Sequence, residues 1–107
     1  MSNLKSEFWV KAYLKRLSLE GICGFVVHHG DGDAGDLLIK MSTLDGAAQL
    51  FQREYNLQLG QRTWNCTFFG SEEDTDVSVK KKLRFDPDLW VLEVEDAQGR
   101  NFLDSML

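Results

Sequence analysis

The sequence predicts a single α+β domain, with a mostly antiparallel sheet of about five strands and two helices. The chain has 107 residues, of which 43% are hydrophobic and 27% charged, and this is typical of one globular domain. An amphipathic helical pattern opens the chain, and short segments with the alternation of strands follow it. We expect residues 1–107 to share one core. The first helix packs on one face of the sheet, and a second short helix precedes the last strand.

Residues 4–20 have the spacing of an amphipathic helix, and Gly21 suits the left-handed conformation that ends many helices. A second, narrower apolar line lies outside the main stripe and comprises Phe8, Ala12 and Leu19. This helix therefore has a surface beyond the one that packs on the sheet. The main stripe consists of Trp9, Val10, Tyr13, Leu14 and Leu17.

Residues 22–29 and 37–42 have the composition of strands. Residues 47–55 fit helical spacing as well as strand spacing, but the Asp-Gly hairpin signal just before them favours a strand. Residues 62–69 alternate and predict a half-buried strand. Its inward face would carry Arg62, Trp64, Cys66 and Phe68.

The last third of the chain predicts a helix over residues 77–85 and a strand over residues 89–96. The helix stops before Pro87, because a proline disfavours helical backbone at the residue that precedes it. A turn follows the strand, and Phe102 and Leu103 fold back onto the core.

The predicted core draws on both helices and on four of the five strands, and residues 47–55 contribute none. Both cysteines alternate with apolar residues on strands, so we expect the two thiols to be buried, inert and reduced, and a Cys23–Cys66 disulfide is the alternative. The core residues are Trp9, Tyr13, Leu14, Leu17, Phe25, Val27, Ile39, Trp64, Phe68, Leu83, Trp90, Leu92 and Val94.

Charge, cysteine content and the N-terminus predict a cytoplasmic protein. Two cysteines are few for a secreted domain of this size, and the first residues lack the apolar stretch of a signal peptide. No segment approaches the ~20 apolar residues of a membrane span. The 17 acidic residues against 12 basic ones make a nucleic-acid partner unlikely on charge alone.

The densest group of candidate ligands runs from His28 to Asp36. Asp31 and Asp33 resemble the opening of a calcium loop, but the positions that follow depart from that pattern. His28 and His29 are adjacent and would point to opposite faces of a strand, which suits zinc poorly. A solvated hairpin turn is the expected structure. His28, Asp31 and Asp33 remain the weak metal candidates, and no cofactor is predicted.

Two basic clusters form the alternative, a nucleic-acid interface. This alternative requires both predicted helices to present one continuous basic face. The clusters are Lys11, Lys15 and Arg16 near the N-terminus, and Lys80, Lys81, Lys82 and Arg84 in the second helix. The helix dipole explains the second cluster without a ligand, because acidic residues precede it and basic residues end the helix.

Three stretches of the chain share a recognisable pattern. The most specific is Phe85-Asp86-Pro87-Asp88-Leu89-Trp90-Val91, continued by residues 93–96 and 99–103. The other two are residues 9–14 and 30–35. In these stretches the chain resembles a bacterial family, domain of unknown function 1491. The resemblance implies a small, single-domain bacterial protein and assigns no catalytic residue.

The sequence favours a non-catalytic module that binds a protein partner, a second copy of the chain being one such partner. The apolar line of Phe8, Ala12 and Leu19 and the free edges of an open sheet support this interpretation. No catalytic residue is predicted. An enzyme that uses the loop from His28 to Asp36 is a further alternative.

Overall fold

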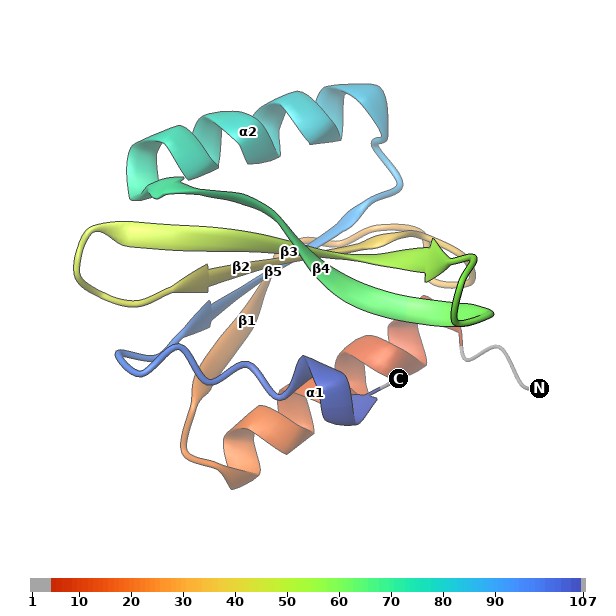
Figure 1. Cartoon of the computed structure of the whole chain (residues 1–107), viewed down its shortest axis with the longest axis horizontal. Helices are drawn as coiled ribbons and strands as arrows, with labels where there is room; N and C mark the ends of the chain where they lie inside the picture. Colours follow the sequence, from red (N-terminus) through yellow and green to blue (C-terminus); the bar gives the residue numbers. More distant parts are fainter. Residues whose placement is uncertain (1–4, 107) are drawn as a thin grey trace.

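The computed structural model describes residues 5–106, which form a five-stranded sheet with one helix on each face (Figure 1). This confirms the predicted α+β class and the strand over residues 47–55. The elements in chain order are α1 (Ser6–Leu19), β1 (Cys23–His28), β2 (Leu37–Ser42), β3 (Ala47–Asn56), β4 (Gln61–Ser71), α2 (Glu72–Phe85), β5 (Trp90–Glu95) and the 3-10 turn η1 (Leu103–Met106).

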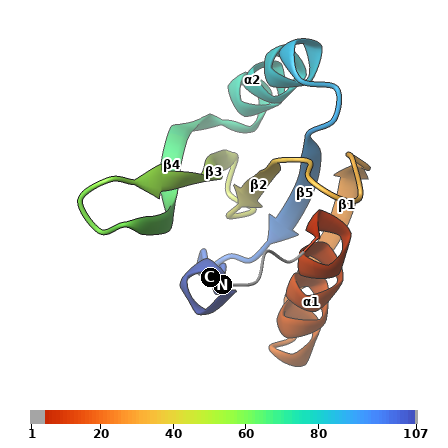
Figure 2. The ribbon, with the colours of Figure 1, turned by 90° about the vertical axis from the view of Figure 1, so that its right-hand side faces the viewer.

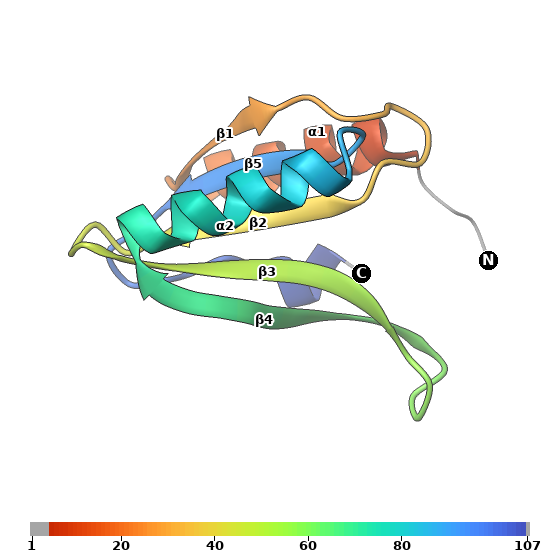
Figure 3. The ribbon, with the colours of Figure 1, turned by 90° about the horizontal axis from the view of Figure 1, so that it is seen from above.

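The strands lie in the order β1-β5-β2-β3-β4. Three neighbouring pairs are antiparallel, and β2 with β5 is parallel, so the sheet is mixed although mostly antiparallel as predicted. The last strand of the chain thus lies between the first two. Helix α2 connects the edge strand β4 to this inner position, and it crosses one face of the sheet on the way (Figure 3).

Each helix covers its own hydrophobic cluster, on opposite faces of the sheet (Figure 2). The larger cluster joins α1 to the sheet and to the C-terminal residues, and it contains Trp9, Val10, Tyr13, Leu17, Ile22, Leu37, Ile39, Met41, Trp90, Leu92, Val94 and Leu103. The smaller cluster lies under α2 and contains Leu38, Leu50, Val79, Leu89 and Val91, with Phe68 and Leu83 packed against it. The packing of Phe102 and Leu103 is confirmed.

Helix α2 begins at Glu72, five residues before the predicted start. Ser71 caps it, because its Oγ accepts a hydrogen bond from the backbone N–H of Asp74 at 3.0 Å. Glu72, Glu73 and Asp74 then occupy the first turn, where the helix dipole favours acidic side chains. The acidic run that precedes residue 77 is therefore the start of the helix.

The prediction that Trp64 and Phe68 share a face was wrong. A bulge shifts the pairing between β3 and β4, since Leu50 pairs with Phe68 but Phe51 pairs with Cys66. The extra residue reverses the alternation of β4. Trp64 consequently packs against the cluster of α1, and Phe68 against the cluster of α2.

Strand β1 is far more exposed than the sequence predicted. Phe25 is 42% exposed and Val27 51%, and Cys23 is exposed too, so none of them belongs to the core. The reason is topological, because β1 is an edge strand and α2 covers other strands. Cys66, at the opposite edge on β4, is also exposed and free.

Both thiols are expected to react in the folded protein, contrary to the prediction of buried cysteines. The physical reason is access, because Cys23 and Cys66 lie exposed on the two edge strands. Titration with Ellman's reagent should give the same thiol count before and after unfolding. Cys23→Ser and Cys66→Ser assign the two reactions, and a thiol that reacts only after unfolding would contradict the exposed position.

Candidate functional site

The loop between β1 and β2 holds several other parts of the chain in place. The carbonyls of Gly32 and Asp33 accept hydrogen bonds from the N–H groups of Glu7 and Ser6, at 3.0 and 3.3 Å. They satisfy donors that the first turn of a helix leaves unpaired. The Asp31 carbonyl accepts the indole N–H of Trp90 at 2.7 Å. The loop therefore caps α1 and holds β5.

The structure does not bring the weak metal candidates together. The Asp31 carboxylate accepts the N–H of Ala34 at 2.9 Å, and Asp33 lies 3.5 Å from the Lys5 ammonium. His28 Nδ1 lies 2.8 Å from the Leu89 carbonyl. Among residues 5–106, no group of three His, Cys, Asp or Glu residues is placed to hold a metal ion.

The glycines of this loop allow backbone to pack on backbone. A Cβ atom on Gly30 would lie 2.2 Å from the Asp88 carbonyl oxygen, and one on Gly35 would lie 2.4 Å from the same atom. These approaches are closer than any Cβ tolerates, so both positions require glycine. Gly30 and Gly35, within the segment that resembled a ligand loop, are thus explained by backbone packing.

The two basic clusters lie on opposite faces of the sheet, because α1 and α2 do (Figure 2). They cannot form the single basic face that a nucleic-acid interface required. Two of the three basic residues of α1 have acidic partners: Lys11 lies 3.3 Å from Glu7, and Arg16 lies 2.6 Å from Glu20. The remaining residues of the two clusters are Lys15, Lys80, Lys81, Lys82 and Arg84.

A buried lysine forms the densest polar cluster in the described part of the chain, and the sequence analysis missed it. The side chain of Lys40, on β2, is 6% exposed. Its Nζ lies 2.7 Å from Glu72, 2.7 Å from Asp76 and 3.5 Å from Glu93. Ser42 donates a hydrogen bond to Glu72. A lysine inside the apolar run of residues 37–42 was the signal that could have revealed it.

The charges in this cluster shift one another's pKa values. The hydrogen bond from Lys40 lowers the pKa of Glu72, and the one from Ser42 lowers it further. Burial is the main cause that raises the pKa of Glu93, although Lys40 opposes it. The cluster joins α2 to β2 and β5 through one cation, so it holds the helix on the sheet.

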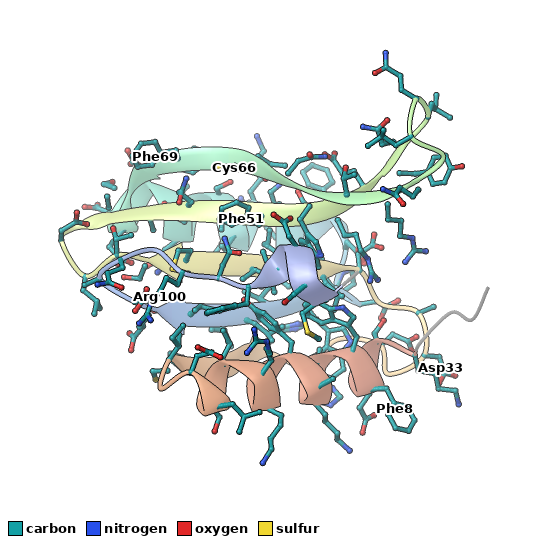
Figure 4. All side chains as sticks on the ribbon, turned by 60° about the horizontal axis from the view of Figure 1, so that its bottom comes forward. Phe8, Asp33, Phe51, Cys66, Phe69 and Arg100 are labelled. Atoms are coloured by element: carbon teal, nitrogen blue, oxygen red, sulfur yellow. The ribbon has the colours of Figure 1, made fainter. Side chains whose placement is uncertain are left out.

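Two shallow depressions lie on the surface of the described residues. One, of about 210 Å³, lies beside the start of α1 and is lined by Phe8, Gly32, Asp33 and three charged residues of α1 and its N-cap. The other, of about 140 Å³, lies between the sheet and the C-terminal residues, beside Phe51 and Trp64. Figure 4 shows Phe8 and Asp33 at one end of α1, and Phe51 on the sheet.

Exposed apolar side chains gather on three surfaces, and Leu44, Phe69, Val77 and Phe85 are exposed elsewhere. The line predicted on α1 is on the outer side of that helix, where Phe8 is 67% and Leu19 69% exposed and Ala12 is exposed as well. The tip of the hairpin of β3 and β4 exposes Tyr55, Leu57 and Leu59. The third surface is the edge of β1, where Phe25, Val26 and Val27 are consecutive.

Comparison with known proteins places this arrangement in a family. The family model described as "Protein of unknown function (DUF1491)" matches residues 4–104. The chain belongs to the DUF1491 family. The match includes every described element except the end of η1, so the resemblance found in the sequence is confirmed. A comparison with the curated proteins found no match.

Three solved structures share the DUF1491 fold seen here. A crystal structure of a DUF1491 family protein from Caulobacter crescentus CB15 is 36% identical, with a TM-score of 0.84 over 94% of this chain and 95% of that one. An NMR structure of a DUF1491 family protein from the same organism is 35% identical, with a TM-score of 0.82 over 96% and 94%. The solution structure of protein Atu0922 from A. tumefaciens is 26% identical, with a TM-score of 0.74 over 88% and 86%.

Gly30→Ala should lower the free energy of unfolding by about 2–3 kcal/mol, because its Cβ meets a backbone carbonyl that cannot move aside. Gly32→Ala, in the same loop, is the matched control, since its Cβ meets only the flexible Glu7 side chain at 3.0 Å. We expect its effect to stay within about 0.5 kcal/mol. Urea unfolding measures both, and equal losses would contradict the packing role of the loop.

Lys40→Met should lower the free energy of unfolding at pH 7 by about 1–2 kcal/mol, because Glu72, Asp76 and Glu93 lose their shared cation. The loss should shrink as the pH falls to about 3. The lowered pKa of Glu72 stabilises the fold only while that carboxyl is ionised, and protonated carboxyls no longer need Lys40.

Urea unfolding across this pH range checks the lysine prediction. Lys81→Met is the control, since Lys81 is exposed on α2 and no ion pair of it occurs among residues 5–106. A loss for Lys40→Met that stays constant with pH would show that packing, rather than charge, carries its role.

Proposed function

We propose that this DUF1491 domain is a non-catalytic module that binds a protein partner along the free edge of β1. One observation carries the proposal: this edge strand has no charged residue and no proline, and three consecutive apolar side chains on it are exposed. Natural edge strands are usually protected by charges or prolines, since their unpaired N–H and C=O groups accept further strands. An unprotected edge suits a partner that adds a strand.

The opposite edge is less suited to this role. Strand β4 has the sequence Gln-Arg-Thr-Trp-Asn-Cys-Thr-Phe-Phe-Gly-Ser and begins with polar residues, among them the charged Arg62. Both edge strands contain a register shift, β1 between Val26 and His28 and β4 opposite Leu50 and Phe51, so the bulges do not distinguish the two edges. Asn65 also donates a hydrogen bond to Glu54 across the hairpin at 2.8 Å. The β1 edge is therefore the more open of the two.

The proposal also includes the cellular compartment, the bacterial cytoplasm. No helix among residues 5–106 is long and apolar enough to cross a membrane. Two free, exposed thiols suit the reducing cytoplasm, and relatives from Caulobacter crescentus and A. tumefaciens support a bacterial origin. We propose a bacterial cytoplasmic protein.

A charge on β1 should abolish partner binding. Val27→Lys places a charged side chain on the edge, where it opposes strand addition. Val27 is half exposed, so the fold should be kept, and circular dichroism confirms it. Affinity capture from the source organism should retain a defined protein with the wild-type chain and lose at least nine-tenths of it, about 1.4 kcal/mol, with this variant.

Two matched baits locate the contact. Leu57→Lys adds the same charge at the exposed hairpin tip and should leave capture unchanged. Phe8→Ser tests the outer side of α1, the surface on which the sequence analysis placed the partner. Capture that depends on Phe8 and not on Val27 would move the binding surface from β1 to α1, and capture insensitive to both would reject a binding role for either surface.

A further inference from the structure

The edge of β1 is left uncovered on one face of the sheet as well as along its backbone. Helix α2 packs on side chains from the other four strands and their connections, and no β1 residue joins the cluster beneath it in the described part of the chain. Figure 3 shows β1 beside α2 rather than below it. Phe25 lies on this uncovered face, since it pairs with Glu93, which faces α2 and Lys40.

We infer that the β1 edge is occupied by the β1 strand of a second copy of this chain, paired antiparallel about a two-fold axis at Val26. The inference rests on the proposed function and names its partner. Each copy supplies the same unpaired strand, so one two-fold contact covers both β1 edges, and the β4 strands form the two ends of the joined sheet. The result is a ten-stranded sheet, from five strands in each copy.

The side chains favour this self-pairing. Phe25 of one copy would lie close to Phe25 of the other, so that the two rings cover each other where α2 does not reach. The strand is Cys-Gly-Phe-Val-Val-His, and it brings no acidic or lysine side chain to the contact, although the chain carries a net charge of −5. Two copies therefore meet without placing like charges in the paired strands.

Analytical ultracentrifugation of the full chain tests this pairing from about 10 µM to about 1 mM, a range suited to a small interface. We expect a monomer–dimer equilibrium for the wild type. Val27→Lys should weaken dimerisation at least tenfold, and Leu57→Lys, at the far edge, should dimerise like the wild type.

A cross-link locates the axis. In a Cys23→Ser and Cys66→Ser background, Val26→Cys should form an intermolecular disulfide on mild oxidation, since residues at the axis bring their Cα atoms within the ~6 Å that a disulfide spans. Leu57→Cys in the same background should form little. Equal cross-linking of the two variants would overturn the proposed axis.

The outcomes separate the two proposals. A chain that remains monomeric at about 1 mM overturns the second copy as partner. If such a monomer still captures another protein in a Val27-dependent manner, strand binding at β1 stands and only the identity of the partner is wrong. A dimer that forms equally well with Val27→Lys rejects β1 as the contact between copies.

Discussion

The position of β5 is the constraint on which the rest of the structure depends. This strand is the last in the chain, yet it pairs with β1 on one side and β2 on the other. Its residues Trp90, Leu92 and Val94 belong to the cluster under α1, and Val91 belongs to the one under α2. Neither face of the sheet is complete until the C-terminal third of the chain is in place, so folding depends on contacts distant in sequence.

The same constraint fixes the path of α2 and the exposure of β1. The chain leaves β4 at one edge and must reach the centre of the sheet, so its connecting helix crosses only part of one face. The loop between β1 and β2 then holds the start of β5 in place. The Asp31 carbonyl of this loop accepts a hydrogen bond from the Trp90 indole, and its glycines pack against the Asp88 backbone. Strand β1 therefore pairs with β5 alone, and α2 does not cover it on its face of the sheet.

The sequence could predict local structure and the larger part of the core, because those follow from periodicity. The apolar stripe of α1 and the alternation of Trp90, Leu92 and Val94 placed those residues correctly. Properties that depend on strand order could not be predicted. Phe25 and Val27 have the composition of a buried strand, but an edge position exposes them. Phe68 was misplaced because one extra residue in β4 reverses its alternation.

In the candidate site, too, features that follow from local periodicity could be predicted, and features that depend on contacts distant in sequence could not. Phe8, Ala12 and Leu19 were predicted to lie outside the packed stripe of α1, and they are exposed there. The cluster around Lys40 was missed because its carboxylates come from α2 and β5, more than thirty residues further along the chain. A buried cation with three acidic partners on two elements is satisfied by the fold itself, so it explains how α2 is held without implying a ligand. The β1 edge differs, because one side of this strand has no neighbouring strand and its apolar side chains are exposed, so it can accept a further strand.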